Sequence, residues 1–158
     1  MKKFIIGLFV LMMLATSVYA ADVNKDLAKV RAATAKYHNV DAALADGYVA
    51  APVCVEVPGL GAMGYHYELP GSIDGIVDPL RPEALLYVPS GNGLRLVGVE
   101  YIVDAGAVAG APTLFGQTFD GPMPGHHPGQ PTHYDLHVWL WSKNPSGMFS
   151  QFNPKLTC

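Results

Sequence analysis

The chain has 158 residues, of which half are hydrophobic, and its formal net charge is −3. This length suits a single domain with one core. The acidic balance argues against nucleic acid or anionic lipid as a partner, because both reward dense positive charge.

Residues 1–20 have the three parts of a cleavable signal peptide. Lys2 and Lys3 precede an apolar run at 4–14, and small residues follow up to Ala20. The apolar run is shorter than the roughly 20 residues that a membrane-spanning helix needs, so we favour cleavage over the alternative of a permanent anchor. We therefore expect a secreted or periplasmic protein with one domain at 21–158 and no membrane association after cleavage. Without its two leading lysines, this domain has eight basic and thirteen acidic residues, a net charge of −5.

The two cysteines, Cys54 and Cys158, predict one disulfide. An even pair in a small exported domain is most simply a bridge. The alternative is a thiolate that acts as a ligand or nucleophile. A cysteine at the very end of a chain favours the bridge, because chain ends are mobile unless they are tied down.

A helical segment is predicted over 24–46, which contains neither proline nor glycine. Asn24 is expected to cap its start, Gly47 to end it, and Asn39 to divide it into two helices. His38 lies off the apolar stripe and is expected to face solvent. The stripe recurs at three- and four-residue steps and comprises Leu27, Val30, Thr34, Tyr37, Leu44 and Tyr48.

From Pro52 onward, helical periodicity gives way to short runs of strand character between prolines and glycines. The fold class is therefore predicted as α+β and β-rich, with a helix or helix pair followed by an antiparallel sheet, small barrel or sandwich. Residues 90–93 predict the turn of a β-hairpin. Residues 105–132 are expected to form a long loop that either serves the function, as a lid or rim, or is partly mobile. The predicted strands are 53–57, 62–69, 84–88, 94–104 and 133–141.

The last of these strands has an unusual polar face. Alternation places His133, Asp135 and His137 on one face, continuing into two tryptophans, and apolar residues on the other. Neighbours on that face are about 6.6 Å apart, so Asp135 can share a metal with either histidine. His133 and His137 are about 13 Å apart and can share one only if the strand bends or bulges.

Two further polar residues fall on apolar strands. Glu100 is predicted on the face of Leu96, Gly98 and Ile102, opposite a face that carries Val97, and a buried carboxylate is costly unless it meets a cation or strong donors. Gly98 is expected to allow another backbone or a ligand to approach closely.

His66 shares a face with the small residues Ala62 and Gly64. These small neighbours are expected to leave room above the imidazole, as a pocket would require.

These residues favour a site for one divalent transition metal: copper, zinc or iron. The expected ligands are His66, Glu100 and His137, with His133 or Asp135 as a fourth group. The alternative is a set of polar residues that bond one another, with Glu100 paired to an imidazole or to Arg95.

The loop at 121–129 holds three further candidate ligands. Adjacent histidines in such a loop, here His126 and His127, are more often simply exposed. If they join the site together with Met123, the thioether favours copper.

Three functions are compatible with this pattern. The first is a metal carrier or small metalloenzyme, in which Glu100 or Asp135 can instead act as a general base. The second is a non-catalytic carbohydrate- or cell-wall-binding module that uses tyrosines and Trp139 or Trp141. The third is a structural or partner-binding role, which would leave the histidines scattered in space.

Five motifs together resemble a family of small secreted bacterial proteins that is uncharacterised. The resemblance covers most of residues 21–158 and implies export and one compact domain, but no activity. Its motifs are Ala-Asp-Gly-Tyr at 45–48, Met-Gly-Tyr-His-Tyr at 63–67, Val-Gly-Val-Glu-Tyr at 97–101, His-Tyr-Asp-Leu-His-Val-Trp-Leu-Trp at 133–141 and the Asn-Pro to Cys ending at 153–158.

Overall fold

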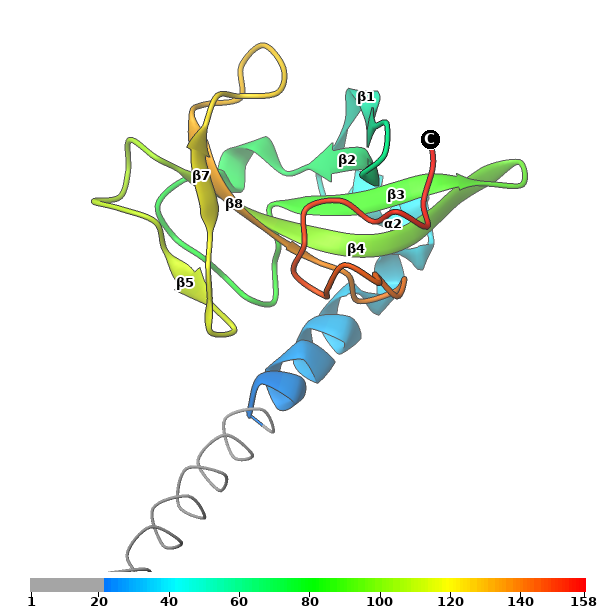
Figure 1. The fold of residues 1–158 in the computed structure, drawn as a ribbon, viewed down its shortest axis with the longest axis horizontal. Coiled ribbons are helices and arrows are strands. Elements are labelled where there is room, and N and C mark those ends of the chain that lie inside the picture. The colour runs from blue at the N-terminus through cyan, green and yellow to red at the C-terminus, as the bar shows by residue number, and fades with distance from the viewer. Residues whose placement is uncertain (1–21) are drawn as a thin grey trace, which may run out of the picture.

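The structure, a computed structural model, describes residues 22–158. It is an α+β fold in which a helical segment precedes a curled antiparallel sheet of six strands, with a separate small sheet of two strands (Figure 1). The predicted fold class is thus confirmed, whereas the predicted signal peptide lies outside the described residues. Within the described part of the chain, no helix has both the length and the apolar character needed to cross a membrane.

The helical segment is divided at Asn39, as predicted. The asparagine side chain accepts a hydrogen bond of 3.0 Å from the backbone N–H of Asp41 and so caps the second helix. Gly47 follows that helix with a φ of +94°, the left-handed conformation that glycine adopts without strain. Asn24 is not the cap, because the first helix already includes residue 22. The helical elements are 22–34, the 3-10 turn η1 (Ala35–His38) and α2 (Val40–Ala45).

One face of this segment is buried against the sheet. Leu27, Val30 and Tyr37 belong to the main hydrophobic core, as the periodicity indicates. In α2 the buried residue is Ala43, while Leu44 is half exposed. The prediction for Leu44 is wrong because the break at the helix division interrupts the periodicity on which it was based.

All five predicted strands are present in the main sheet, and its strand order is β1-β2-β3-β4-β8-β7 with every neighbouring pair antiparallel. The predicted hairpin turn joins β3 and β4. The strands are β1 (Val49–Val57), β2 (Gly61–Glu68), β3 (Ala84–Ser90), β4 (Gly93–Asp104), β7 (Asp120–Met123) and β8 (His133–Val138).

The region predicted as a long loop, 105–132, contains three short strands. β5 (Thr113–Leu114) and β6 (Gln117–Thr118) form the small sheet, and β7 extends the main sheet along β8. The prediction of a continuous loop is therefore wrong. The remaining segment, 124–132, connects β7 to β8.

A bulge between β3 and β4 changes which side chains share a face. Leu86 pairs with Gly98, but Tyr87 pairs with Leu96, so Val97 is an extra residue on β4. Leu96 consequently joins the helix-covered core, and Val97 packs on the opposite face. The predicted alternation therefore holds from Val99 onward and is reversed before the bulge.

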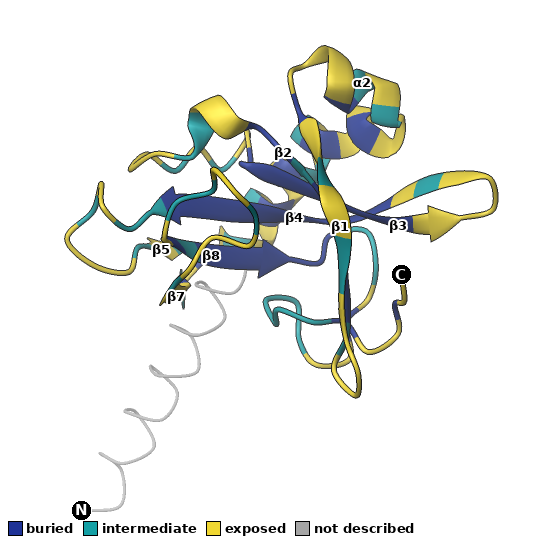
Figure 2. Ribbon diagram, turned by 90° about the horizontal axis from the view of Figure 1, so that it is seen from above, coloured by how far each residue is buried: buried dark blue, intermediate teal, exposed yellow. Residues whose placement is uncertain are grey.

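The two faces of the sheet are covered differently. The helical segment covers one face, and the chain's final segment packs on the other, where Leu156 joins Trp139 in a second apolar cluster. β3, β4 and β8 are the most deeply buried strands (Figure 2). The predicted disulfide joins Cys54 and Cys158, and thereby fixes the end of the chain to β1.

Candidate metal centre

The strand register places a row of polar residues on the face away from the helices. Across the sheet, Glu68 lies opposite Ala84, Ala84 opposite Glu100, and Glu100 opposite His137. His66 is two residues from Glu68 on β2 and therefore shares this face. The methyl side chain of Ala84 separates the two carboxylates. The row thus brings residues from four strands together without any irregular backbone.

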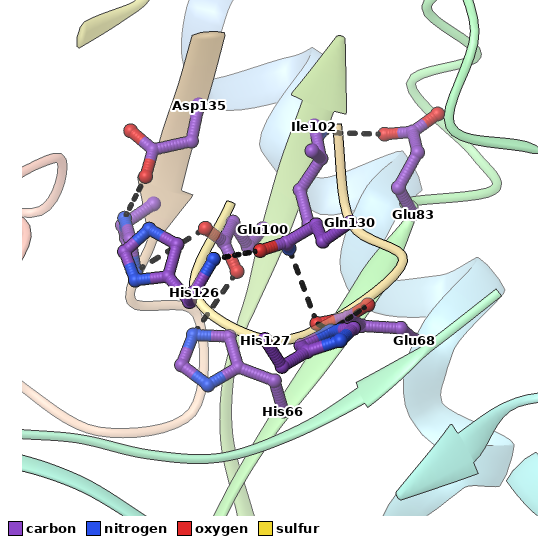
Figure 3. A network of polar contacts seen from close by, with 10 residues as sticks. His66, Glu68, Glu83, Glu100, Ile102, His126, His127, Gln130 and Asp135 are labelled. Carbon is purple, nitrogen blue, oxygen red and sulfur yellow. Dashed lines mark hydrogen bonds and ion pairs between the residues drawn. The ribbon is translucent and has the colours of Figure 1, made fainter. Parts of the chain in front are cut away.

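His66, Glu100 and His137 form the first group, and each can offer one ligand atom within 4.8 Å of the others. The His66 Nε2 atom lies 3.1 Å from Glu100 Oε2, and the His137 Nε2 atom lies 3.7 Å from Glu100 Oε1. These side chains come from β2, β4 and β8, and all three are buried. Two imidazoles thus face one carboxylate inside the protein, and Figure 3 shows His66 beside Glu100.

Three polar atoms of this group lack hydrogen-bond partners among residues 22–158. They are Oε2 of Glu100 and both ring nitrogens of His137. Although His66 Nε2 is close to Oε2 of Glu100, the two do not make a hydrogen bond. A buried polar atom without a partner costs about 1–3 kcal/mol. A cation bound between these side chains would remove that cost.

Burial also sets the protonation of this group. It raises the pKa of Glu100 to about 8, with the nearby Asp135 opposing the increase and Glu68 adding to it. Burial lowers the pKa of His66, and it lowers that of His137 well below the ordinary value, helped by the neighbouring imidazoles. Both imidazoles are therefore neutral at pH 7, which is the form that binds metals.

A second group consists of His126, His133 and Asp135, whose candidate ligand atoms again lie within 4.8 Å of one another. His133 and Asp135 are buried on β8, whereas His126 is exposed on the segment 124–132. The Nε2 atom of His133 and both carboxylate oxygens of Asp135 have no partner in the described part of the chain. Burial, followed by the neighbouring Glu100, raises the pKa of Asp135 to about 9.

The segment 124–132 also closes over the first group. His127 Nε2 lies 3.0 and 2.9 Å from the two carboxylate oxygens of Glu68, and the Gln130 amide donates to Glu68 at 3.3 Å. The Gln130 side-chain oxygen in turn accepts a hydrogen bond of 2.6 Å from the His126 backbone N–H (Figure 3). Glu68 therefore anchors this segment beside the histidines.

A pocket leads from the surface to the first group. His66 and Glu100 lie at its polar end together with Glu68, His126, His127 and Gln130. Its other walls are mostly apolar. They are formed by Ala51, Pro52, Val53, Val55 and Met63. His66 thus lies at a pocket between β1 and the segment 124–132.

The five residues predicted as ligands lie close together, but in two groups. His66, Glu100 and His137 form one group, while His133 and Asp135 belong to the other. The two groups adjoin, because Asp135 Oδ2 is 4.0 Å from His137 Nδ1.

Two expectations about neighbouring residues need correction. Arg95 is exposed and does not pair with Glu100. Gly64 does not leave space for a pocket, since a Cβ there would lie 2.3 Å from the carbonyl oxygen of Tyr87. Met123 lies opposite His133 in the pairing of β7 with β8, and it also lines a cavity next to the chain's final segment. Gly98, by contrast, allows the close backbone approach that was expected, because its missing Cβ would lie 2.8 Å from the Val138 carbonyl oxygen.

The sequence pattern offered His126 only as a further candidate ligand that was expected to be exposed, and it did not identify Glu68 as part of the site. His126 lies in a Pro/Gly-rich stretch and is exposed, as expected. Its ring nevertheless lies next to that of His133, with the ring centroids 5.2 Å apart. Its neighbour His127 is bound to Glu68 rather than free. The adjacency of the two histidines was the available signal, and only the pairing of β7 with β8 brings them to the sheet.

Glu83 is buried like Glu68, Glu100 and Asp135 but lies outside both ligand groups, and it allows a test of the burial argument. Its Oε2 accepts a hydrogen bond of 3.1 Å from the Ile102 N–H, and burial raises its pKa from 4.5 to about 8. Because the folded pKa is the higher one, the stabilisation it provides is complete below about pH 4.5 and is lost as the pH rises through about 8.

Glu83→Gln is therefore expected to flatten the pH dependence of the unfolding free energy. The difference in unfolding free energy between the variant and the natural protein should shift in favour of the variant from pH 4.5 to pH 9. The shift should be on the order of a few kcal/mol. Urea unfolding at several pH values measures this. Parallel curves for the two proteins would contradict it.

Comparisons of the chain with family models, with curated proteins and with solved structures find no match. The candidate site is therefore argued from the residues of this chain.

Proposed function

We propose that this domain binds a divalent transition metal through His66, Glu100 and His137. The observation that carries the proposal is the convergence of these three buried side chains from three strands, in which Glu100 and His137 have polar atoms without a hydrogen-bond partner among the described residues. A buried set of this kind is costly to keep without a cation. Bound metal would supply the partners that Glu100 and His137 lack.

The chemistry of the ligands narrows the choice of metal. Two imidazoles and one carboxylate suit zinc, copper or iron, and are the composition of many catalytic sites with three protein ligands. Cys54 and Cys158 are joined to each other and so supply no thiolate.

The pocket is relevant to whether the protein is a carrier of the metal or an enzyme that uses the metal as a cofactor. Three protein ligands leave a coordination position for water or substrate, and the pocket at His66 gives a small molecule access to it. In an enzyme that holds this ion alone, Asp135 would be the candidate general base, since its carboxylate lies beside His137 and has no partner in 22–158. In a carrier, the same opening would serve entry and release.

Export to an oxidising compartment forms part of the proposal. It is supported by the signal pattern at 1–20 and by the Cys54–Cys158 disulfide, because such bridges persist in secreted and periplasmic proteins. The carbohydrate-binding alternative gains less support. Trp139 is buried and donates to the Ser150 carbonyl, so its ring is not available as a stacking surface.

The test is the metal content of protein purified without chelators, compared between the natural protein and His137→Ala. The natural protein is expected to retain a metal, and the variant to lose it. His38→Ala is the matched control, because His38 is exposed and outside both groups. A second variant, His137→Gln, keeps most of the side-chain volume and guards against a loss caused by unfolding.

A natural protein that is free of metal and has no affinity for copper, zinc or iron would refute the proposal. Equal metal content in the natural protein and in a folded His137→Gln variant would also refute it.

A further inference from the structure

His133 is too far along its strand to join the first group. It is four residues from His137 on β8, which corresponds to about 13 Å of extended backbone. The pairing of β8 with β4 runs without a register shift from Asp104–His133 to Val99–Val138. No bulge therefore shortens the distance, and the condition under which both histidines could bind the same ion is not met.

The imidazole of His133 nevertheless has the hydrogen bonding expected of a metal ligand. Its Nδ1 lies 3.0 Å from the carbonyl oxygen of Pro131, and a carbonyl can only accept, so Nδ1 carries the proton. The lone pair is consequently on Nε2, which is buried and has no partner within residues 22–158. A hydrogen bond that fixes one ring nitrogen and frees the other is the usual environment of a metal-binding histidine.

Two further groups face this nitrogen. Asp135 lies two residues along the same face of β8, and both of its carboxylate oxygens lack partners in the described structure. The third group is His126, on the segment that returns over the sheet. This cluster thus contains two side chains, His133 and Asp135, that are more than nine-tenths buried and have polar atoms without partners in the described structure. The exposed imidazole of His126 is the ligand that an ion from solvent would meet first.

Asp135 also joins this cluster to the first group. Its Oδ2 atom is 4.0 Å from His137 Nδ1, and its pKa responds to the charge of Glu100. Together the clusters offer four imidazoles and two carboxylates, which exceeds the four ligands of a tetrahedral ion. Divided equally, they provide three ligands to each of two ions and leave an open position on both.

We propose that His126, His133 and Asp135 bind a second divalent transition metal ion, adjacent to the ion held by His66, Glu100 and His137. This extends the proposed function, on which it rests, from a single site to a two-ion centre. Pairs of adjacent ions suit the polarisation of a substrate that bridges them.

The test is a titration of chelator-treated protein with Co²⁺, followed by visible absorption and checked by elemental analysis after desalting. The natural protein is expected to bind two ions. His126→Ala and His133→Gln should each bind one, and Glu100→Gln should also bind one. His126 is exposed, so its replacement does not threaten the core, and His38→Ala serves as the control that keeps two ions.

The outcomes separate this inference from the proposed function. One ion in the natural protein that is lost in Glu100→Gln but retained in His126→Ala and His133→Gln overturns the second site and leaves the first. One ion that is lost in all three variants overturns the inference in favour of a single shared site. One ion that is lost only in the His126 and His133 variants refutes the first site, and no binding refutes both.

Discussion

Glu100→Gln is expected to weaken metal binding at the first site by at least about 100-fold while the protein still folds. The change removes a negatively charged ligand, and loss of an outer-shell partner alone already costs about 10–100-fold. The fold should tolerate it because the amide has nearly the shape of the carboxyl group. The Nε2 atom of His137, which lies beside the carboxylate and lacks a partner among the described residues, can accept from the new N–H₂ group.

Isothermal titration with Zn²⁺ measures this loss, and chemical unfolding provides a second readout. At a free metal concentration of 100 times the dissociation constant, bound metal should stabilise the natural protein by about 2.7 kcal/mol. The variant should show almost none of this gain at the same concentration. Glu83→Gln is the matched control, because Glu83 is also a buried carboxyl group but lies outside both ligand groups. Unchanged Zn²⁺ affinity in Glu100→Gln would remove Glu100 from the site.

Removing the disulfide by the double change Cys54→Ala and Cys158→Ala is expected to cost up to about 4.7 kcal/mol of unfolding free energy. The bridge closes a loop with a sequence separation of 104, which restricts the unfolded chain strongly. Cys158 is exposed and Cys54 only partly buried, so little packing is lost with the sulfur atoms. The effect should therefore reflect mainly the lost cross-link.

Urea unfolding of the oxidised natural protein and of the double variant measures the difference. Metal binding should survive in the double variant under conditions where it remains folded, because neither cysteine is a proposed ligand. A stability loss below about 1 kcal/mol would show that the final segment is held by its other contacts, such as the backbone β-bridge between Ala62 and Asn153. Loss of metal from the folded double variant would contradict the ligand assignment.

Most of the fold followed from local patterns. β2, β3 and β4 match their predicted ranges closely, because β-branched and aromatic residues alternate between clear turn signals. β7 could not be predicted in the same way. Its sequence, Asp120–Met123, contains glycine and proline, and it becomes a strand only because β8 provides a pairing edge.

The polar face of β8 was predictable because strand alternation depends only on local geometry. The distances between its members likewise excluded a shared ion for His133 and His137 unless the strand was irregular. Whether β8 is regular depends on its pairing with β4, which the sequence does not show. The partnership of His133 with His126 also depends on a long-range return of the chain. Local patterns thus identified most of the candidate ligands but not their grouping.

The most direct test of the metal centre is the anomalous scattering of zinc in crystals of the protein grown with Zn²⁺. We expect a peak about 2.0–2.2 Å from a ring nitrogen of His66, a ring nitrogen of His137 and a carboxylate oxygen of Glu100. A peak found only on exposed side chains, with none among these three residues, would contradict the proposed metal centre.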